Sequence, residues 1–137
     1  MTGRDESARD FLSAPDAVMS AAREQTGLRL LVLVGSRARG EPHPGSDWDF
    51  ADLADSDFDP AELHRRLSLA LGSNQIDLAD LAAASALFRY QAALDARLVS
   101  GDPELFDEFR IAAVTVYLDM EPVLTRACRD VLAEAGR

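Results

Sequence analysis

The sequence has almost no cysteine and too few basic residues for several common classes of protein. Its single cysteine, Cys128, excludes an internal disulfide and a cysteine-based zinc site, and is typical of a reducing compartment. Because Cys128 lies in an apolar helical stretch, we expect it to be a small core residue. The 14 Lys and Arg residues against 24 Asp and Glu give a formal charge of -10. This balance argues against direct binding of long nucleic acids.

The chain also lacks a long apolar run. Its first residues, MTGRDESARDFLSAP, are polar and acidic, unlike a signal peptide, and no stretch reaches the roughly 18 apolar residues of a membrane span. We therefore expect a cytoplasmic protein without a membrane partner. Apolar residues still make up 47% of the 137 positions, which predicts one folded domain over 1–137. Its core is expected at about 14–100 and a helical segment at about 102–136.

Three short segments have the patterns of β-strands. LRLLVLV at 28–34 is apolar apart from one arginine, which predicts a strand buried on both faces. DWDFADL at 47–53 alternates between its two faces, although we expect it to fray to solvent near Asp52. QIDL at 75–78 is apolar around one aspartate. These segments predict a short mixed sheet.

Capping residues and apolar spacing predict the helices around this sheet. The expected helices are at about 14–26, between Asp59-Pro60 and Gly72, and from Ser85 to about 98. RARG after the first strand has room for about one turn. After Asp102-Pro103, apolar residues recur every three or four positions to the end of the chain. They predict one long amphipathic helix, or two that meet near Pro122, packed mainly in the core but with some apolar area left for a helical partner.

The end of the first strand looks suited to an anion. Gly35-Ser36 offers backbone N–H groups, a hydroxyl and a residue without a side chain where a strand turns into a helix, so it is a candidate triphosphate cradle. An ordinary turn is the simpler interpretation of these two residues alone. Arg37 is a candidate phosphate contact, whereas we expect Arg39 to be mainly structural.

Two carboxylates begin the second strand. Alternation puts Asp47 and Asp49 on one face, roughly 6 to 7 Å apart by strand geometry, with Trp48 and Phe50 in the core behind them. Oxygen ligands of this kind suit magnesium. The simpler interpretation of these two residues alone is a pair of solvated aspartates beside a loop.

A third carboxylate changes this balance. Asp77 is a lone charge in an apolar strand, where an unpaired carboxylate is costly. If its strand lies beside the second strand, Asp77 joins Asp47 and Asp49. Three carboxylates facing a phosphate cradle predict a two-metal site for phosphoryl transfer.

The pattern of GS, ten residues and then DxD, in the form GSRARG followed by SDWD, resembles the minimal nucleotidyltransferases of the DNA polymerase beta superfamily. More narrowly, it resembles the MntA-type antitoxins that are paired with HEPN-domain toxins. The resemblance is specific from about Leu28 to Asp49 and is supported at Asp77. It implies the nucleotidyltransferase fold, an α/β (α+β) arrangement of a short mixed sheet flanked by helices.

The same resemblance implies the site and its chemistry. Gly35 and Ser36 would bind the triphosphate of ATP, while Asp47 and Asp49 hold Mg²⁺, two ions in all. Asp77 would bind the catalytic metal and help to deprotonate the attacking hydroxyl. The acceptor would be a tyrosine of the HEPN ribonuclease toxin, which becomes adenylylated and inactive within a hetero-oligomer.

Two alternatives stay open at this point. The first is transfer of a nucleotide to a small hydroxylated molecule such as an aminoglycoside, although no second domain is evident to hold it. The second is a catalytically silent antitoxin that acts by occlusion. The histidines add no candidate, because His43 in the EPHPG loop and His64 on the exposed side of a helix are expected to be ordinary surface residues.

Overall fold

A four-stranded mixed sheet forms the centre of the molecule. The computed structural model describes residues 15–41 and 45–135, so His43 lies outside the described residues. The strand order is β3-β2-β1-β4, with β2 parallel to β3 and the other neighbouring pairs antiparallel. The strands are β1 (Leu28–Val34), β2 (Trp48–Ala54), β3 (Ile76–Asp80) and β4 (Arg97–Gly101). The three predicted strands and the mixed sheet are confirmed.

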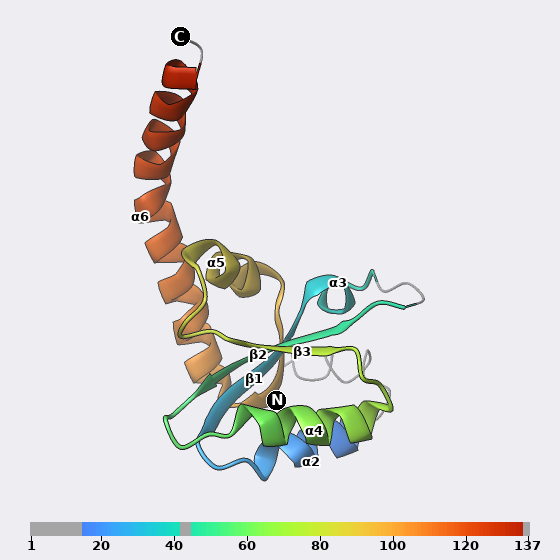
Figure 1. Ribbon diagram of the computed structural model, residues 1–137. Helices are drawn as coiled ribbons and strands as arrows, with labels where there is room; N and C mark the ends of the chain where they lie inside the picture. Colours follow the sequence, from blue (N-terminus) through green and yellow to red (C-terminus); the bar gives the residue numbers. More distant parts are fainter. Residues whose placement is uncertain (1–14, 42–44, 136–137) are drawn as a thin grey trace.

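Helices cover both faces of the sheet (Figure 1). One face packs against α2 (Pro15–Arg23) and α4 (Pro60–Leu71), and the other against α5 (Ala86–Asp95) and the first part of α6 (Pro103–Ala135). The short α3 (Gly35–Ala38) continues directly from β1. The central strand β1 therefore lies between two apolar layers, which explains why nearly all of its side chains are apolar.

The local capping signals fix α4 as predicted. Asp59 caps its start, where the carboxylate accepts hydrogen bonds from the backbone N–H groups of Ala61 and Glu62 at 3.1 and 3.3 Å. Gly72 ends the helix in the left-handed conformation, with φ of 62°. Helix α4 is the crossover connection that allows β2 and β3 to pair in parallel.

Alternation along β2 separates core from site, as predicted. Trp48 and Phe50 are buried against α2 and α4, whereas Ala51 is buried toward α5 and α6. Asp49 therefore shares the face of Ala51, on the side of α5. The two aromatic side chains hold β2 from behind while the carboxylate points to the other side.

One predicted helix boundary was wrong, and one strand was missed. The helix expected to reach about residue 98 ends at Asp95, and residues 97–101 form β4, which pairs with β1. This strand was missed because Leu98 and Val99 are its only large apolar residues, and they also fit a helical spacing. The alternative left open near Pro122 is also resolved, since α6 is one helix of 33 residues with Pro122 inside it.

The second part of α6 leaves the body of the molecule (Figure 1). Phe106, Phe109 and Ala113 are buried, and Val114 still packs partly against the core. Beyond Val114 the apolar stripe is exposed, apart from Tyr117, which stacks on Tyr90 of α5 with ring centroids 4.2 Å apart. The prediction that this stripe is mainly core was therefore wrong. So was the prediction for Cys128, which is exposed on α6. Within the described ranges, no helix is both long and apolar enough to span a membrane.

Two polar residues are more buried than predicted. Asp52 does not lie at a frayed end, because β2 continues to Ala54 and Asp52 is only 4% exposed. His64 is half-buried, and its Nε2 lies 2.8 Å from the backbone oxygen of Ile76, which fits a ring N–H donating to that carbonyl. His64 thus connects α4 to the start of β3.

Asp52 makes the stability of the fold depend on pH. Burial, and then the charge of the neighbouring Asp80, raises the pKa of Asp52 to about 6. Since the folded state holds this proton more tightly than the unfolded state, Asp52 costs stability above pH 6 and costs least below pH 4. We expect Asp52→Asn to stabilise the protein by about 1–3 kcal/mol at pH 7.5, with a smaller gain at pH 4. Denaturant unfolding at both pH values measures this.

The matched control is Asp80→Asn. This variant removes the charge of Asp80, which is the weaker of the two causes of the raised pKa of Asp52. It should therefore increase the free energy of unfolding by less than Asp52→Asn does. A gain for Asp52→Asn that is equal at both pH values would show that ionisation of Asp52 is not its source.

Candidate active site

Gly35 lies at the junction of β1 and α3 and in contact with Asp49. Its φ is +74°, and a Cβ atom there would lie 2.5 Å from Oδ2 of Asp49. Both the conformation and the close approach require a residue without a side chain. The glycine of the GS motif thus brings the backbone directly against the second aspartate of DxD. Ser36 follows in α3 and is partly exposed.

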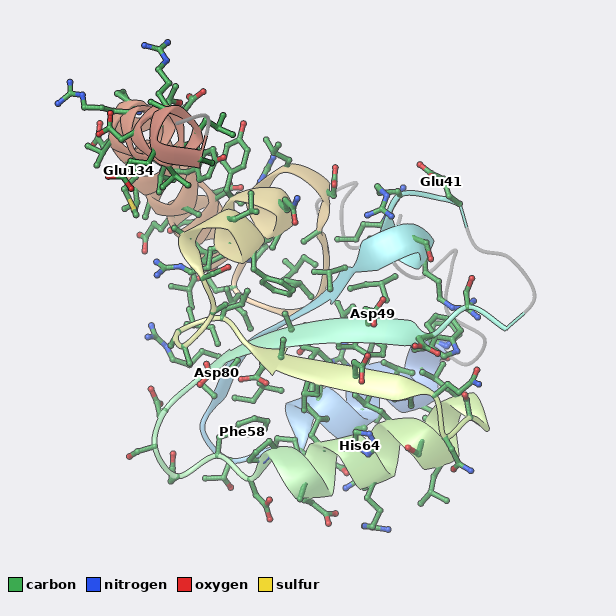
Figure 2. The ribbon with its side chains drawn as sticks, turned by 45° about the horizontal axis from the view of Figure 1, so that its top comes forward. Glu41, Asp49, Phe58, His64, Asp80 and Glu134 are labelled. Atoms are coloured by element: carbon green, nitrogen blue, oxygen red, sulfur yellow. The ribbon has the colours of Figure 1, made fainter. Side chains whose placement is uncertain are left out.

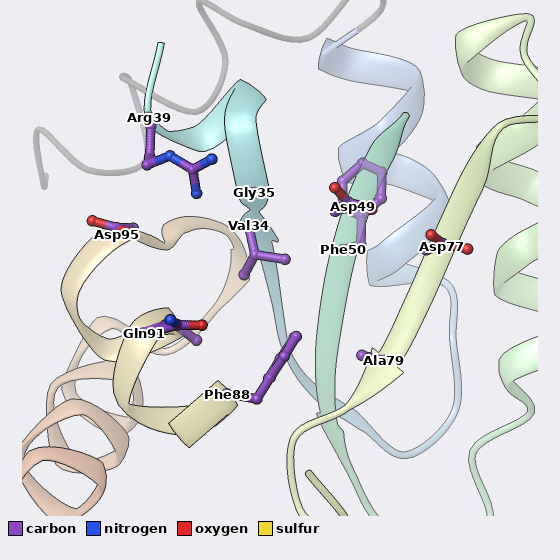
Figure 3. A pocket seen from close by; sticks show the side chains of 11 residues that line it. Val34, Gly35, Arg39, Asp49, Phe50, Asp77, Ala79, Phe88, Gln91 and Asp95 are labelled. Atoms are coloured by element: carbon purple, nitrogen blue, oxygen red, sulfur yellow. The ribbon is translucent and has the colours of Figure 1, made fainter. Parts of the chain in front are cut away.

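The parallel register of β2 and β3 aligns Asp49 with Asp77. Aligned residues of neighbouring parallel strands point to the same face of the sheet, and Figure 3 shows Asp49 and Asp77 on adjacent strands across from α5. The prediction that the strand of Asp77 lies beside that of Asp49 is confirmed. The metal-binding role of these residues stays a prediction.

Crowding of negative charge affects Asp49. Burial raises the pKa of its carboxyl, and the carboxylates of Asp77 and Asp47 raise it further, whereas the charge of Arg37 opposes them. Asp47 itself is exposed and precedes the first residue of β2. The three predicted carboxylates therefore interact electrostatically, with Asp49 in the middle.

Arg37 holds the segment that leads into β2. Its guanidinium donates to the backbone oxygens of Ser46 and Asp47, at 3.0 and 3.3 Å, and lies 3.8 Å from the centre of the Trp48 ring. These contacts fix the backbone on which Asp47 stands. In the structure the donors of Arg37 face this segment. The predicted contact of Arg37 with phosphate therefore stays a prediction.

A cavity of about 420 Å³ lies between the strand ends and α5 (Figure 3). Of the residues proposed from the sequence, Gly35, Asp49 and Asp77 line it, while Ser36, Arg37 and Asp47 do not. Arg39, which we expected to be mainly structural, also lines the cavity, and it forms an ion pair with Glu41 at 3.8 Å.

The wall formed by α5 was missed from the sequence. It consists of Phe88, Gln91, Ala92 and Asp95. Their spacing of three or four residues after the Ser85 cap is a signal for one helix face. Periodicity does not say what such a face opposes, so these residues could not be assigned to a site before the fold was known.

The donors at the strand ends suit a hard cation. Carboxylate oxygens are the ligands that Mg²⁺ prefers, and a divalent cation relieves the repulsion that raises the pKa of Asp49. Among residues 15–41 and 45–135, however, no three His, Cys, Asp or Glu side chains already converge on one point as a preformed metal centre. The chemistry of these donors therefore fits magnesium, and Asp49 and Asp77 are the two predicted carboxylates that line the same cavity.

Comparison with known proteins agrees with this geometry. A family model described as "Polymerase beta, Nucleotidyltransferase" matches residues 17–104, which is more than half of the chain. Protein adenylyltransferase MntA of Aphanizomenon flos-aquae is 31% identical over 96 residues. That match covers 61% of this chain and 64% of MntA, so the chain spans slightly less than two thirds of this relative.

Solved structures share the fold. A crystal structure of a toxin–antitoxin with AMP-PNP has a TM-score of 0.73 and 27% identity, covering 86% of this chain and 98% of the other. An MNT antitoxin in complex with a tri-AMPylated HEPN toxin of Shewanella oneidensis has a TM-score of 0.68, covering 87% and 96%, and at 24% identity shows the fold alone. With the family model spanning β1, β2 and β3 and their site, this chain belongs to the polymerase beta nucleotidyltransferase family.

Proposed function

We propose that this chain transfers AMP from ATP to a tyrosine hydroxyl of a HEPN-domain toxin and thereby neutralises it. The observation that carries the proposal is the contact of Gly35 with Asp49, which itself lies in register with Asp77; all three residues line one cavity. Relatives support the activity, since one is named a protein adenylyltransferase and another is a toxin–antitoxin with AMP-PNP.

Gly35 and Ser36 are the proposed contacts of the triphosphate. A side chain at Gly35 would fill the space beside Asp49, so its absence leaves room for a phosphate to approach the backbone. The hydroxyl of Ser36, the next residue in the chain, is the proposed further donor to the phosphates. Carboxylates alone would repel a triphosphate, which is why the proposal includes a cation between them.

Asp47, Asp49 and Asp77 are the proposed ligands of Mg²⁺. A metal ion held by these carboxylates would neutralise charge on the phosphates and favour ionisation of the attacking hydroxyl. Arg37 supports this set indirectly, because it holds the backbone oxygen of Asp47 at 3.3 Å from its own Nε. In this scheme Arg37 positions a ligand and does not itself contact the reacting atoms.

The reaction is an in-line displacement at the α-phosphorus. The tyrosine oxygen forms a new bond to phosphorus, the bond to the bridging oxygen of the β-phosphate breaks, and pyrophosphate leaves. Asp77 is the proposed acceptor of the tyrosine proton, which it passes to solvent. A phenol, with an ordinary pKa of about 10, loses that proton more readily than an aliphatic alcohol. The chain's own contribution is mainly to position charge.

Helix α6 supports the proposal of a protein partner. Large apolar side chains along it are 40 to 71% exposed: Ile111, Val116, Leu118, Met120, Val123, Leu124, Val131 and Leu132. An apolar surface of this kind on a projecting helix is typical of a docking site for another protein. The formal charge of -10 also suits a partner with a basic, RNA-cutting face.

The experiment that tests the function measures the mass of the partner. The protein is incubated with a HEPN-domain toxin, ATP and Mg²⁺, and intact-mass and peptide spectra of the toxin are recorded. We expect the toxin to gain one or more AMP units on tyrosine and to lose ribonuclease activity. EDTA should prevent the gain, and ATP without this protein should leave the toxin unchanged.

Other outcomes would support the two alternatives. A tight complex and loss of ribonuclease activity without any change in mass would favour occlusion. An unmodified toxin together with an adenylylated aminoglycoside would favour the small-molecule transferase.

A further inference from the structure

Phe88 is an aromatic side chain shared by two neighbouring hollows. It lines the cavity of about 420 Å³ that contains Asp49 and Asp77, and also a second hollow of about 380 Å³ beside the segment 83–85. Its side chain is only partly buried, although α5 packs against the sheet. Phe88 is therefore a half-buried ring that remains accessible from the main cavity.

The lining of the main cavity changes in chemistry along β3 and α5. Gly35, Asp49 and Asp77 are at the strand termini, whereas Ala79, Phe88 and Ala92 form an apolar end further along these elements. Val34 pairs with Asp49, and the charged residues Arg39 and Asp95 also line the cavity. Ala79 lies two residues beyond Asp77 on the same face of β3, which is about 7 Å along a strand. The alanines stop at Cβ and leave space in front of the Phe88 ring. The apolar end thus suits a flat group that is joined to something anionic.

Gln91 adds the polar group that such a flat ring needs. It lies one turn after Phe88 on the same face of α5 and lines the same cavity (Figure 3). Its amide carries both a donor and an acceptor. The edge of an adenine offers the matching pair, an exocyclic amine and a ring nitrogen.

We propose that the nucleobase of the substrate stacks on Phe88 and that Gln91 reads its edge. This inference rests on the proposed nucleotidyltransferase function and deepens it, because it assigns the nucleoside half of the substrate to α5 and the phosphates to the strand ends. The GS and DxD motifs identify residues for the phosphates and the metal only, and the cap at Ser85 identifies only the start of α5. Phe88 and Gln91 thus make α5 the element that selects the nucleotide.

Binding measurements by titration calorimetry with Mg²⁺ separate the two halves of the substrate. The probes are AMP-PNP, GMP-PNP and tripolyphosphate, which has the phosphates but no nucleoside. Because one stacked base contributes substantially to binding, Phe88→Leu should weaken AMP-PNP by about 10-fold or more and leave tripolyphosphate within about 2-fold. Phe88→Tyr, which keeps the aromatic face, should restore AMP-PNP binding.

The role of Gln91 has its own signature. In Gln91→Glu the carboxylate only accepts hydrogen bonds, so it should weaken AMP-PNP more than GMP-PNP, whose base edge presents two donors. The matched control is Leu87→Ala on the same helix, since Leu87 is 49% exposed and does not line the cavity. It should leave the binding of all three probes unchanged.

Several results would overturn the inference. If Phe88→Leu weakened AMP-PNP and tripolyphosphate equally, its effect would be structural. If it left AMP-PNP binding intact but prevented transfer, the hollow would belong to the acceptor. Wild-type protein that binds AMP-PNP no better than tripolyphosphate would exclude a base site while leaving the proposed function in place. Wild-type protein that binds none of the probes would overturn both.

Discussion

Asp49→Asn is expected to abolish AMP transfer while leaving the fold at least as stable as before. Asp49 touches the space beside Gly35, lies in register with Asp77 and is affected by the charge of Asp47. Its replacement removes the central member of the proposed magnesium ligands. Stabilisation of several kcal/mol by such a cation corresponds to a loss of about 10³-fold or more in rate. The measurement is the initial rate of AMP incorporation into the toxin.

Stability should change in the opposite direction to activity. Burial and neighbouring carboxylates raise the pKa of Asp49, which means that its charged form is disfavoured in the folded protein without metal. Asparagine has nearly the same shape and no charge. In EDTA at pH 7.5, the Tm of Asp49→Asn should therefore equal or exceed that of the wild type.

Asp52→Asn is the matched control for this experiment. It makes the same substitution on the same strand, but three residues further along and on the opposite face. It should gain stability and keep full activity. Retention of transfer by Asp49→Asn, or equal losses of activity in both variants, would contradict the proposed role of Asp49.

Gly35→Ala is expected to reduce transfer by about 100-fold or more and to destabilise the protein. The new Cβ would lie 2.5 Å from Oδ2 of Asp49, so the carboxylate must move, and a displacement of about 1 Å in a catalytic site has this effect on rate. The residue must also hold φ of +74°, which costs an alanine about 1–2 kcal/mol. Rates of AMP incorporation and denaturant unfolding measure the two effects.

Gly72→Ala is the control that separates backbone strain at positive φ from the contact with Asp49. Gly72 also has positive φ, at 62°, but nothing lies within 4 Å of a Cβ placed there. It should show a comparable loss of stability with little loss of activity. If Gly35→Ala were as active as Gly72→Ala, the contact between Gly35 and Asp49 would not matter for the reaction.

Interactions between residues close together in the chain were sufficient to predict the local elements and the carboxylates of the site. Asp59, Pro60 and Gly72 set the bounds of α4 through hydrogen bonds and conformations that depend on neighbouring residues alone. The apolar run of β1 predicted a strand covered on both faces. Period-two alternation put Asp49 opposite Phe50, which the burial of Phe50 confirms.

Contacts between distant segments of the chain determine which element packs against each face of a strand or helix. Parallel pairing of β2 with β3 aligns Asp77 with Asp49. Figure 2 shows Asp49 near one end of the sheet and Asp80 near the other. The packing of α5 against the sheet adds Phe88 and Gln91 to the cavity. Pairing with β1 made residues 97–101 a strand, although their own pattern was ambiguous.

Local patterns do not show which element packs against a face, and this explains the wrong predictions along α6 and at Asp52. A helical period identifies an apolar stripe but not its partner, so Cys128 and the residues around it were expected in a core that does not extend to them. Asp52 was expected at a frayed edge, yet β1 and β3 flank it on both sides. Periodicity depends on neighbours in the chain, whereas burial and the assembly of a site depend on contacts between residues far apart in sequence, and only the folded chain defines these contacts.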